Sequence, residues 1–146
     1  MKERTAMDAA LRLIGRQPYS ERRLRERLSK MGFEAAEIAA CLERLTGWGY
    51  LNDRAYGVAR VELLKRRLKS RAYVKADLAA EGIARELISE LLGEHYSDAD
   101  EIIIARTLLA KRAGAGEIGV KECQKLARAG FAEHTIGRCF QEISTP

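Results

Sequence analysis

Several features are scarce in this sequence of 146 residues, and each absence excludes a class of protein. Proline occurs only at Pro18 and Pro146, and no stretch is rich in proline and serine. Because proline interrupts helices and such stretches tether separate domains, we expect one continuous helical array. No segment alternates between apolar and polar residues over many positions, so we predict no β-sheet.

Long apolar runs are also missing. The longest run falls far short of the roughly 18 residues that indicate a membrane-spanning helix. Residues 1–5 lack the apolar stretch of a secretory signal peptide. We therefore expect no membrane association and a cytoplasmic location. The three cysteines are widely separated, and Cys41 and Cys139 stand beside apolar residues. Buried thiols are expected there, in preference to disulfides or metal ligands.

The residue types that catalysis and metal binding require are few and scattered. His95 and His134, the two histidines, lie far apart, and no pair of cysteines has metal-ligand spacing. No histidine stands out as the base of an activated nucleophile. We expect no metal, no cofactor, no catalytic residue and no enzymatic activity. Residues 114–119 match the letters of a dinucleotide fingerprint, G-x-G-x-x-G, but a helical segment precedes them, so we predict a connector.

One short pattern occurs three times. The motif Leu-x-x-x-Gly followed by an apolar residue recurs at Gly32, Gly82 and Gly130, about 50 residues apart, which is typical of repeat proteins. A glycine just past a helix end takes up left-handed backbone, and the next residue packs on the leucine of the last turn. The isoleucine that follows in each copy is spaced to pack on the same apolar residue from the next helix. The motif therefore predicts three matching helix-to-helix corners.

Helical periodicity predicts an all-α fold without a sheet: an elongated array of three tandem three-helix repeats, each resembling a helix-turn-helix unit. Ser20 and Asp53 are predicted N-caps, and Ser97 forms a predicted capping pair with Asp100. We expect Met31 on the buried side of its helix. The repeats are predicted at 1–51, 52–96 and 97–146, and the helices at about 4–16, 21–31, 35–46, 54–69, 72–80, 85–95, 98–112, 118–128 and 133–143.

The positive charge is unevenly distributed. The net charge is +5, and most of the excess cations lie in the first two repeats, which suits an anionic partner. No acidic residue stands four positions from Arg23 or Arg27, nor from Lys65, Arg67, Lys69 or Arg71, whereas Glu26 is a potential partner of Lys30. Unpaired like charges one turn apart repel. A solvated helix face is the alternative interpretation. We predict a partner-binding or nucleic-acid-binding surface formed by Arg23, Arg27, Lys30, Lys65, Arg66, Arg67, Lys69, Arg71 and Lys75.

The order of these elements resembles that of the RecX family of bacterial recombinase regulators. The most specific block runs from Gly49 to Asp53, reads Gly-Tyr-Leu-Asn-Asp, and is followed by the aromatic Tyr56. An arginine- and lysine-rich helix and the second Leu-x-x-x-Gly motif come next, in the family's order. Where the family usually has a lysine- and glycine-rich turn after the basic helix, this sequence reads Lys69-Ser70-Arg71.

The resemblance implies three tandem three-helix repeats and a regulatory protein that acts on RecA. Members bind the RecA–DNA filament, are thought to lie along its groove, and inhibit its ATPase, strand-exchange and coprotease activities in recombination, DNA repair and the SOS response. It further implies RecA and weakly, non-specifically bound single- or double-stranded DNA as partners. We expect a monomer.

Two other functions are compatible with the pattern. A three-helix unit with a glycine corner also resembles a helix-turn-helix regulator that reads a DNA sequence. The third helix of each predicted repeat is rich in Ala, Leu, Ile and Glu, however, which favours packing over base contacts. A repeat scaffold that binds a peptide and no nucleic acid is the other alternative. Tyr73 would either stack on a partner or be buried in its own helix.

Overall fold

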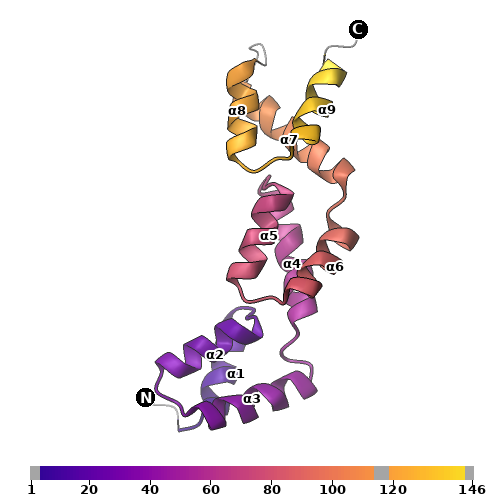
Figure 1. Ribbon diagram of the computed structural model, residues 1–146. Coiled ribbons are helices and arrows are strands. Elements are labelled where there is room, and N and C mark those ends of the chain that lie inside the picture. The colour runs from indigo at the N-terminus through magenta and orange to yellow at the C-terminus, as the bar shows by residue number, and fades with distance from the viewer. Residues whose placement is uncertain (1–3, 114–118, 144–146) are drawn as a thin grey trace.

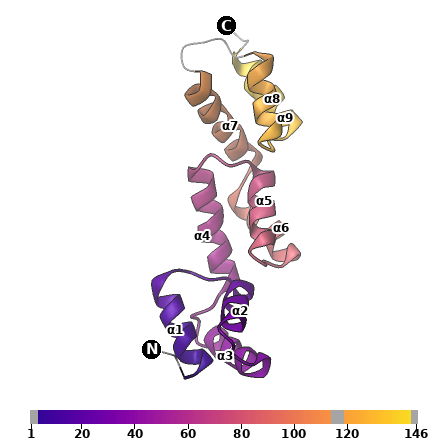
Figure 2. The ribbon, with the colours of Figure 1, turned by 90° about the vertical axis from the view of Figure 1, so that its left-hand side faces the viewer.

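The computed structural model describes residues 4–113 and 119–143. Within these ranges it contains α-helices and no strand, and they form an elongated array with the two termini at opposite ends (Figures 1 and 2). The predicted all-α repeat fold is therefore confirmed. The helices are α1 (Ala6–Arg16), α2 (Glu21–Lys30), α3 (Ala35–Gly47), α4 (Asp53–Arg66), α5 (Arg71–Ala80), α6 (Arg85–His95), α7 (Asp98–Ala113), α8 (Val120–Arg128) and α9 (Glu133–Ile143).

The helices pack in groups of three along the chain. Helices α1, α2 and α3 pack together, as do α4, α5 and α6, and then α7, α8 and α9 (Figure 1). We name these groups repeat 1, repeat 2 and repeat 3, with the predicted limits 1–51, 52–96 and 97–146. Most of the predicted connector, 114–119, lies outside the described residues.

The three predicted corners have the same backbone geometry. Each glycine lies just past the end of the second helix of its repeat, with φ of +94°, +86° and +93° at Gly32, Gly82 and Gly130. The residue after each glycine donates its N–H to the carbonyl of the leucine in the motif, which satisfies a carbonyl that the helix end leaves open. These bonds are Phe33 to Leu28 at 3.4 Å, Ile83 to Leu78 at 3.0 Å and Phe131 to Leu126 at 3.1 Å.

A fourth corner, between α4 and α5, forms without glycine. Leu68 takes up the left-handed conformation, with φ of +60°. Its N–H bonds to the Lys65 carbonyl at 2.9 Å, and the N–H of Lys69 bonds to the Leu64 carbonyl at 3.0 Å. Because this turn ends the helix, α4 stops at Arg66, short of the predicted residue 69. Leu68 packs against the core, which offsets part of the strain of its backbone.

The predicted helix caps are partly correct. Ser20 caps α2, since its side chain accepts the N–H of Arg23. Ser97 and Asp100 accept each other's N–H groups, both at 3.0 Å. The prediction for Asp53 is wrong, because Asn52 caps α4 and Asp53 is its first residue. The expectation for Met31 is also wrong: it follows the last turn of α2 as the C-cap and is 38% exposed.

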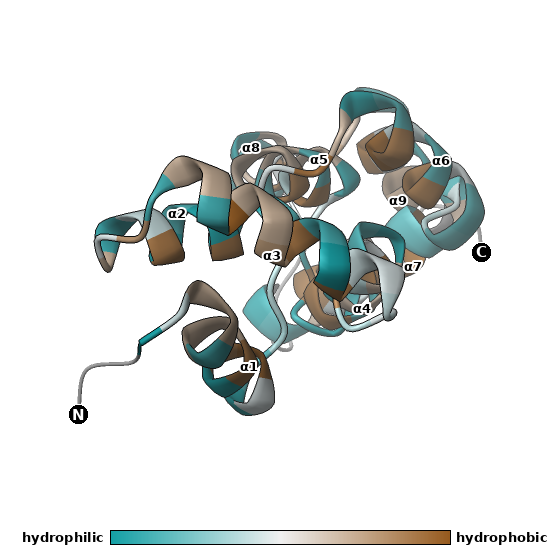
Figure 3. Ribbon diagram, turned by 90° about the horizontal axis from the view of Figure 1, so that it is seen from below, coloured by the Kyte–Doolittle hydropathy of each residue, from teal (hydrophilic) through white to brown (hydrophobic). Residues whose placement is uncertain are grey.

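The hydrophobic core is divided unequally along the array. Repeat 1 has a core of its own, built from the small residues of α1 and the leucines of α2 and α3. Figure 3 shows the hydrophobic side of α2 turned toward α1. Repeats 2 and 3 share one continuous core, which includes Val61 and Leu78 of repeat 2 and Ala105 and Leu126 of repeat 3. Apolar burial therefore joins repeats 2 and 3, whereas the contacts that join repeats 1 and 2 are largely polar.

Both joints between repeats use the same hydrogen bond. The Ser20 hydroxyl donates to the carbonyl of Glu81, the C-cap of α5, at 2.6 Å. The Ser70 hydroxyl donates to the carbonyl of Ala129, the C-cap of α8, at 2.9 Å. Each serine thus caps its own helix and ties that helix to the corner of the next repeat. At the first joint, the N–H of Glu21 also bonds to Asp53 at 2.9 Å, which explains why that carboxylate does not cap α4.

Cys41 and Cys139 are buried free thiols, as predicted. Cys41 and Cys139 are buried, Cys123 is partly exposed, and all three are unpaired. Burial raises the pKa of both Cys41 and Cys139, so little thiolate forms there. We expect one thiol, that of Cys123, to react rapidly with an aromatic disulfide reagent near neutral pH, and all three to react after denaturation. Cys123→Ser should abolish the rapid phase; a rapid phase that survives this substitution would contradict the burial.

Candidate functional site

A groove of about 490 Å³ lies at the joint between repeats 1 and 2. One wall comes from α2, whose residues Arg23, Glu26, Arg27 and Lys30 share a face because they are three or four positions apart. The other wall comes from α4. The complete lining is Gln17, Pro18, Tyr19, Arg23, Glu26, Arg27, Lys30, Tyr56, Ala59, Arg60, Leu63 and Glu81; we call it the joint groove.

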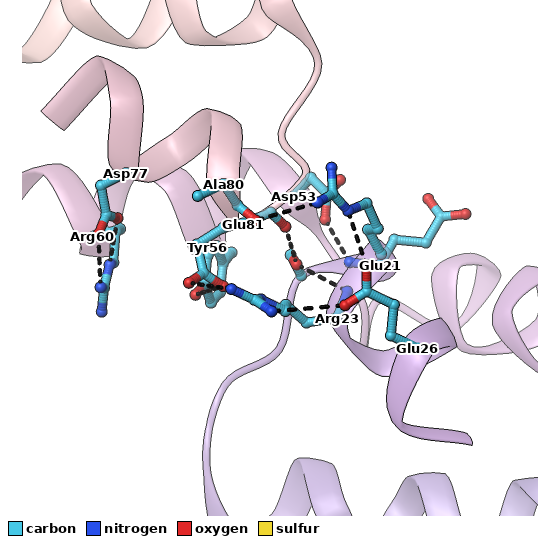
Figure 4. Close-up of polar contacts among 11 residues, drawn as sticks. Glu21, Arg23, Glu26, Asp53, Tyr56, Arg60, Asp77, Ala80 and Glu81 are labelled. Carbon is cyan, nitrogen blue, oxygen red and sulfur yellow. Dashed lines mark hydrogen bonds and ion pairs between the residues drawn. The ribbon is translucent and has the colours of Figure 1, made fainter. Parts of the chain in front are cut away.

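Glu81 is the centre of the polar contacts in the joint groove (Figure 4). Arg23 approaches its carboxylate with two nitrogens, Nε at 3.1 Å and Nη2 at 3.4 Å. The Tyr56 hydroxyl donates to the same carboxylate at 3.1 Å. Burial, and then the charge of Glu81, raises the pKa of Tyr56 to about 12, so this hydroxyl stays protonated and remains a donor. Two walls from different repeats are thus fastened to one carboxylate.

The other cations that line the joint groove differ in whether an acidic side chain pairs with them. Arg60 makes a bidentate contact with Asp77, at 2.7 and 2.9 Å. This hydrogen bonding raises the pKa of Arg60. Arg27 and Lys30 are exposed and, within residues 4–113 and 119–143, have no ion-pair partner. The groove therefore presents two unneutralised cations beside an ordered set of paired ones.

The structure separates the predicted binding residues into groups. Arg23, Arg27 and Lys30 meet in the joint groove. Arg71 and Lys75 line a second groove, on α5 and α6. Arg66 and Arg67 are exposed at the end of α4, and the ammonium of Lys69 lies 4.7 Å from the ring centre of Tyr73. Tyr73 itself is 44% exposed, so it is available to a partner.

Two cations that were predicted to lack an acidic partner, Arg23 and Lys65, form ion pairs with residues far away along the sequence. Arg23 contacts Glu81, as described, and also Glu26 at 3.6 Å. Lys65 is bonded to the carbonyl of His95 at 2.9 Å and to Asp100 at 3.2 Å, which links α4 to the start of α7. The expectation that both were unpaired is wrong, because Glu81 and Asp100 reach them from outside their own helices. Each also pairs with a carboxylate three positions away on its own helix, which for Lys65 is that of Glu62 at 3.8 Å. The ammonium group of Lys65 therefore makes contacts within the protein that hold helices together.

Sequence reasoning missed several residues of the two grooves. Tyr56, Arg60 and Leu63 lie on one face of α4 at helical spacing, and this periodicity was a usable signal for the joint groove. No periodic pattern in the sequence marked Arg22 and Arg85 as residues of the second groove.

In the described ranges, no group of three His, Cys, Asp or Glu side chains is arranged to hold a metal ion. None of the helices described combines the length and apolar composition that crossing a membrane requires.

Comparison with known proteins gives consistent matches. The profile for the first three-helix domain of RecX matches residues 6–45. The regulatory protein RecX of Pelodictyon phaeoclathratiforme is 38% identical over 93 residues, which span 63% of this chain and 58% of that protein. The regulatory protein RecX of Trichlorobacter lovleyi is 34% identical over 127 residues, spanning 86% of this chain and 82% of that protein.

A solved structure shares the fold. The crystal structure of RecX from Lactobacillus salivarius superimposes with a TM-score of 0.83 over 94% of this chain and 93% of that one, at 22% sequence identity. The identity to the Trichlorobacter protein extends over most of both chains. The chain therefore belongs to the RecX family of regulatory proteins.

Proposed function

We propose that this chain binds the RecA–DNA filament and lowers RecA's ATPase, strand-exchange and coprotease activities, without catalysing a reaction itself. Membership of the RecX family supports this function. The observation that carries the proposal is the joint groove, in which Arg27 and Lys30 are unneutralised and lie one turn apart beside ordered arginines. An acidic side chain of a RecA subunit would replace their mutual repulsion with attraction.

The shape of the molecule suits a filament. A helix rises about 1.5 Å per residue, so the 14 residues of α4 alone extend for roughly 20 Å. Three repeats laid end to end, as in Figure 1, span several such lengths. An elongated binder of this kind would be long enough to bridge neighbouring subunits of a filament.

Charge reversal in the joint groove tests this function. We expect Arg27→Glu with Lys30→Glu to raise the protein concentration needed to halve RecA's ATPase rate on single-stranded DNA by at least about tenfold, which corresponds to 1.4 kcal/mol of lost binding. The physical reason is that two attractive contacts would become repulsive ones. The measurement is a titration of the protein into a steady-state ATPase assay.

The matched control is Lys111→Glu with Arg112→Glu, which reverses two exposed charges at the end of α7, far from the groove in sequence. Circular dichroism should show unchanged helicity in both double variants. Equal inhibition by wild type and the Arg27/Lys30 variant would remove the joint groove from the mechanism. Lys65 is unsuitable for such a test, because its reversal would also break the contact with Asp100.

The cations at the end of α4 form a separate candidate contact. Arg66 and Arg67 are exposed, so reversing their charges leaves the core intact. The same ATPase titration compares the loss of inhibition on reversing this pair with the loss on reversing Arg27 and Lys30.

The helix-turn-helix alternative makes a different prediction, namely a preference of about 10³-fold or more for one duplex sequence over random DNA. Binding that is independent of sequence would count against it.

A further inference from the structure

A second groove, of about 620 Å³, runs over α5 and α6 and shares no lining residue with the joint groove. Its charged lining residues are all cationic: Arg22 from α2, Arg71 and Lys75 from α5, and Arg85 from α6. The remaining lining is apolar or small, comprising Ala79, Gly82, Ile83, Ile88, Ser89 and Leu92. We call it the α5–α6 groove. In contrast to the joint groove, no carboxylate lines it.

The cations of this groove are mostly unneutralised within the protein. Lys75 and Arg85 are exposed and have no ion-pair partner in the part of the chain that the structure describes. The Nε of Arg71 is buried and has no hydrogen-bond partner there. A buried N–H donor without an acceptor is unfavourable. The side chain that carries it lines the groove. Of the four, Arg22 is the one with an ion-pair partner among the described residues, Glu26 at 3.2 Å.

This combination points to a ligand with several negative charges and some apolar surface. Arginine forks and lysine ammonium groups bind phosphate oxygens, and phosphates repeat along a nucleic-acid strand. The aliphatic lining would contact the sugars and base faces that an unpaired strand exposes. A duplex buries its base faces in the stack and offers this lining nothing comparable.

We propose that the α5–α6 groove binds the phosphate backbone of single-stranded nucleic acid through Arg71, Lys75 and Arg85. This inference deepens the proposed function and rests on it, because a RecA filament contains such a strand. It assigns the two grooves different partners. The joint groove, with its paired carboxylates, receives protein, and the wholly cationic groove receives the strand.

Fluorescence anisotropy with a labelled oligothymidylate, in the absence of RecA, tests this assignment. We expect Lys75→Gln with Arg85→Gln to weaken binding at least about tenfold at low salt. The slope of log K against log salt concentration should become shallower by about 1.4, since each single-strand phosphate contact contributes about 0.7. Arg71→Gln alone should weaken binding in the same direction. The control is Lys111→Gln with Arg112→Gln, which removes the same charge elsewhere.

Two outcomes would overturn the assignment: unchanged binding of the oligothymidylate by the Lys75/Arg85 variant, or equal weakening by the control pair. Because RecA is absent, each outcome is distinct from a failure of the proposed function. That failure would appear in the ATPase titration of the Arg27/Lys30 variant. Helicity measured by circular dichroism confirms that each variant is folded before its binding is compared.

Discussion

Gly82→Ala is expected to lower the free energy of unfolding by about 2–4 kcal/mol, several times the loss expected for Gly32→Ala. Both glycines have left-handed backbone, with φ of +86° and +94°, where an alanine costs about 1–2 kcal/mol. The smaller entropy of the unfolded alanine chain offsets about 0.4–1 kcal/mol of that cost. Backbone conformation alone therefore predicts a loss of roughly 1 kcal/mol at either corner.

The surroundings of the two corners differ. A Cβ atom on Gly82 would lie 2.5 Å from the Cβ of Arg22, in the joint between repeats 1 and 2. At Gly32 nothing lies within 4 Å, because no repeat packs on that corner. Overpacking at Gly82 would force α2 away from α5, which accounts for the additional 1–3 kcal/mol.

Urea denaturation followed by circular dichroism measures both variants, and Gly130→Ala extends the series. A Cβ on Gly130 would lie 2.8 Å from the Ser70 hydroxyl, so this variant should resemble Gly82→Ala. Equal losses at Gly32 and Gly82 would show that the contact between repeats has little energetic weight. The same motif is thus expected to respond differently according to whether another repeat covers it.

Ser20→Ala and Ser70→Ala are each expected to destabilise the protein by about 2–4 kcal/mol. Losing the helix cap accounts for about 1 kcal/mol. The hydroxyl also donates to a carbonyl of the next repeat, at Glu81 or Ala129. Since both serines are buried, that carbonyl would be left without its donor, which costs about 1–3 kcal/mol.

Ser97→Ala is the matched control, because Ser97 caps α7 but is exposed and donates to no other repeat. It should lose only about 1 kcal/mol. Aspartate separates the two roles further. Ser97→Asp keeps a cap and should remain near wild-type stability. Ser20→Asp also keeps a cap but places a carboxylate against the Glu81 carbonyl, so it should be no more stable than Ser20→Ala. Equal losses for Ser20→Ala and Ser97→Ala would contradict the joint.

The arginines and lysines show where sequence reasoning was insufficient. Arg27 was correctly predicted to be unpaired, because no acidic residue stands at helical spacing from it and none reaches it from elsewhere in the described chain. Lys30 has a potential partner in Glu26, four positions earlier, but the Glu26 carboxylate contacts Arg22 and Arg23 instead. Arg23 and Lys65 were judged by the same rule and are paired. Their partners, Glu81 and Asp100, lie 58 and 35 residues away along the chain. A search for acidic residues four positions away cannot find a partner that arrives only when repeats pack. It also overlooked the carboxylates three positions away, Glu26 for Arg23 and Glu62 for Lys65.

The corner after α4 gives a second example. The family's usual glycine is absent from Lys69-Ser70-Arg71, and the backbone instead turns at Leu68. Ser70 then caps α5 and bonds to repeat 3, which a glycine at that position would not do. The sequence revealed the substitution, but the two bonds of the hydroxyl depend on where repeat 3 lies.

The amino-acid sequence by itself determined the helices, the corners and their threefold recurrence, because these depend on periodicity, on caps such as Ser20 and on glycines next to apolar residues. Each of these interactions connects residues within a few turns of one another. Tertiary structure alone decided the two grooves, the contacts of Arg23 with Glu81 and of Lys65 with Asp100, and the second bond of each joint serine. Those features join residues from different repeats, and their distances are fixed by how whole helices pack.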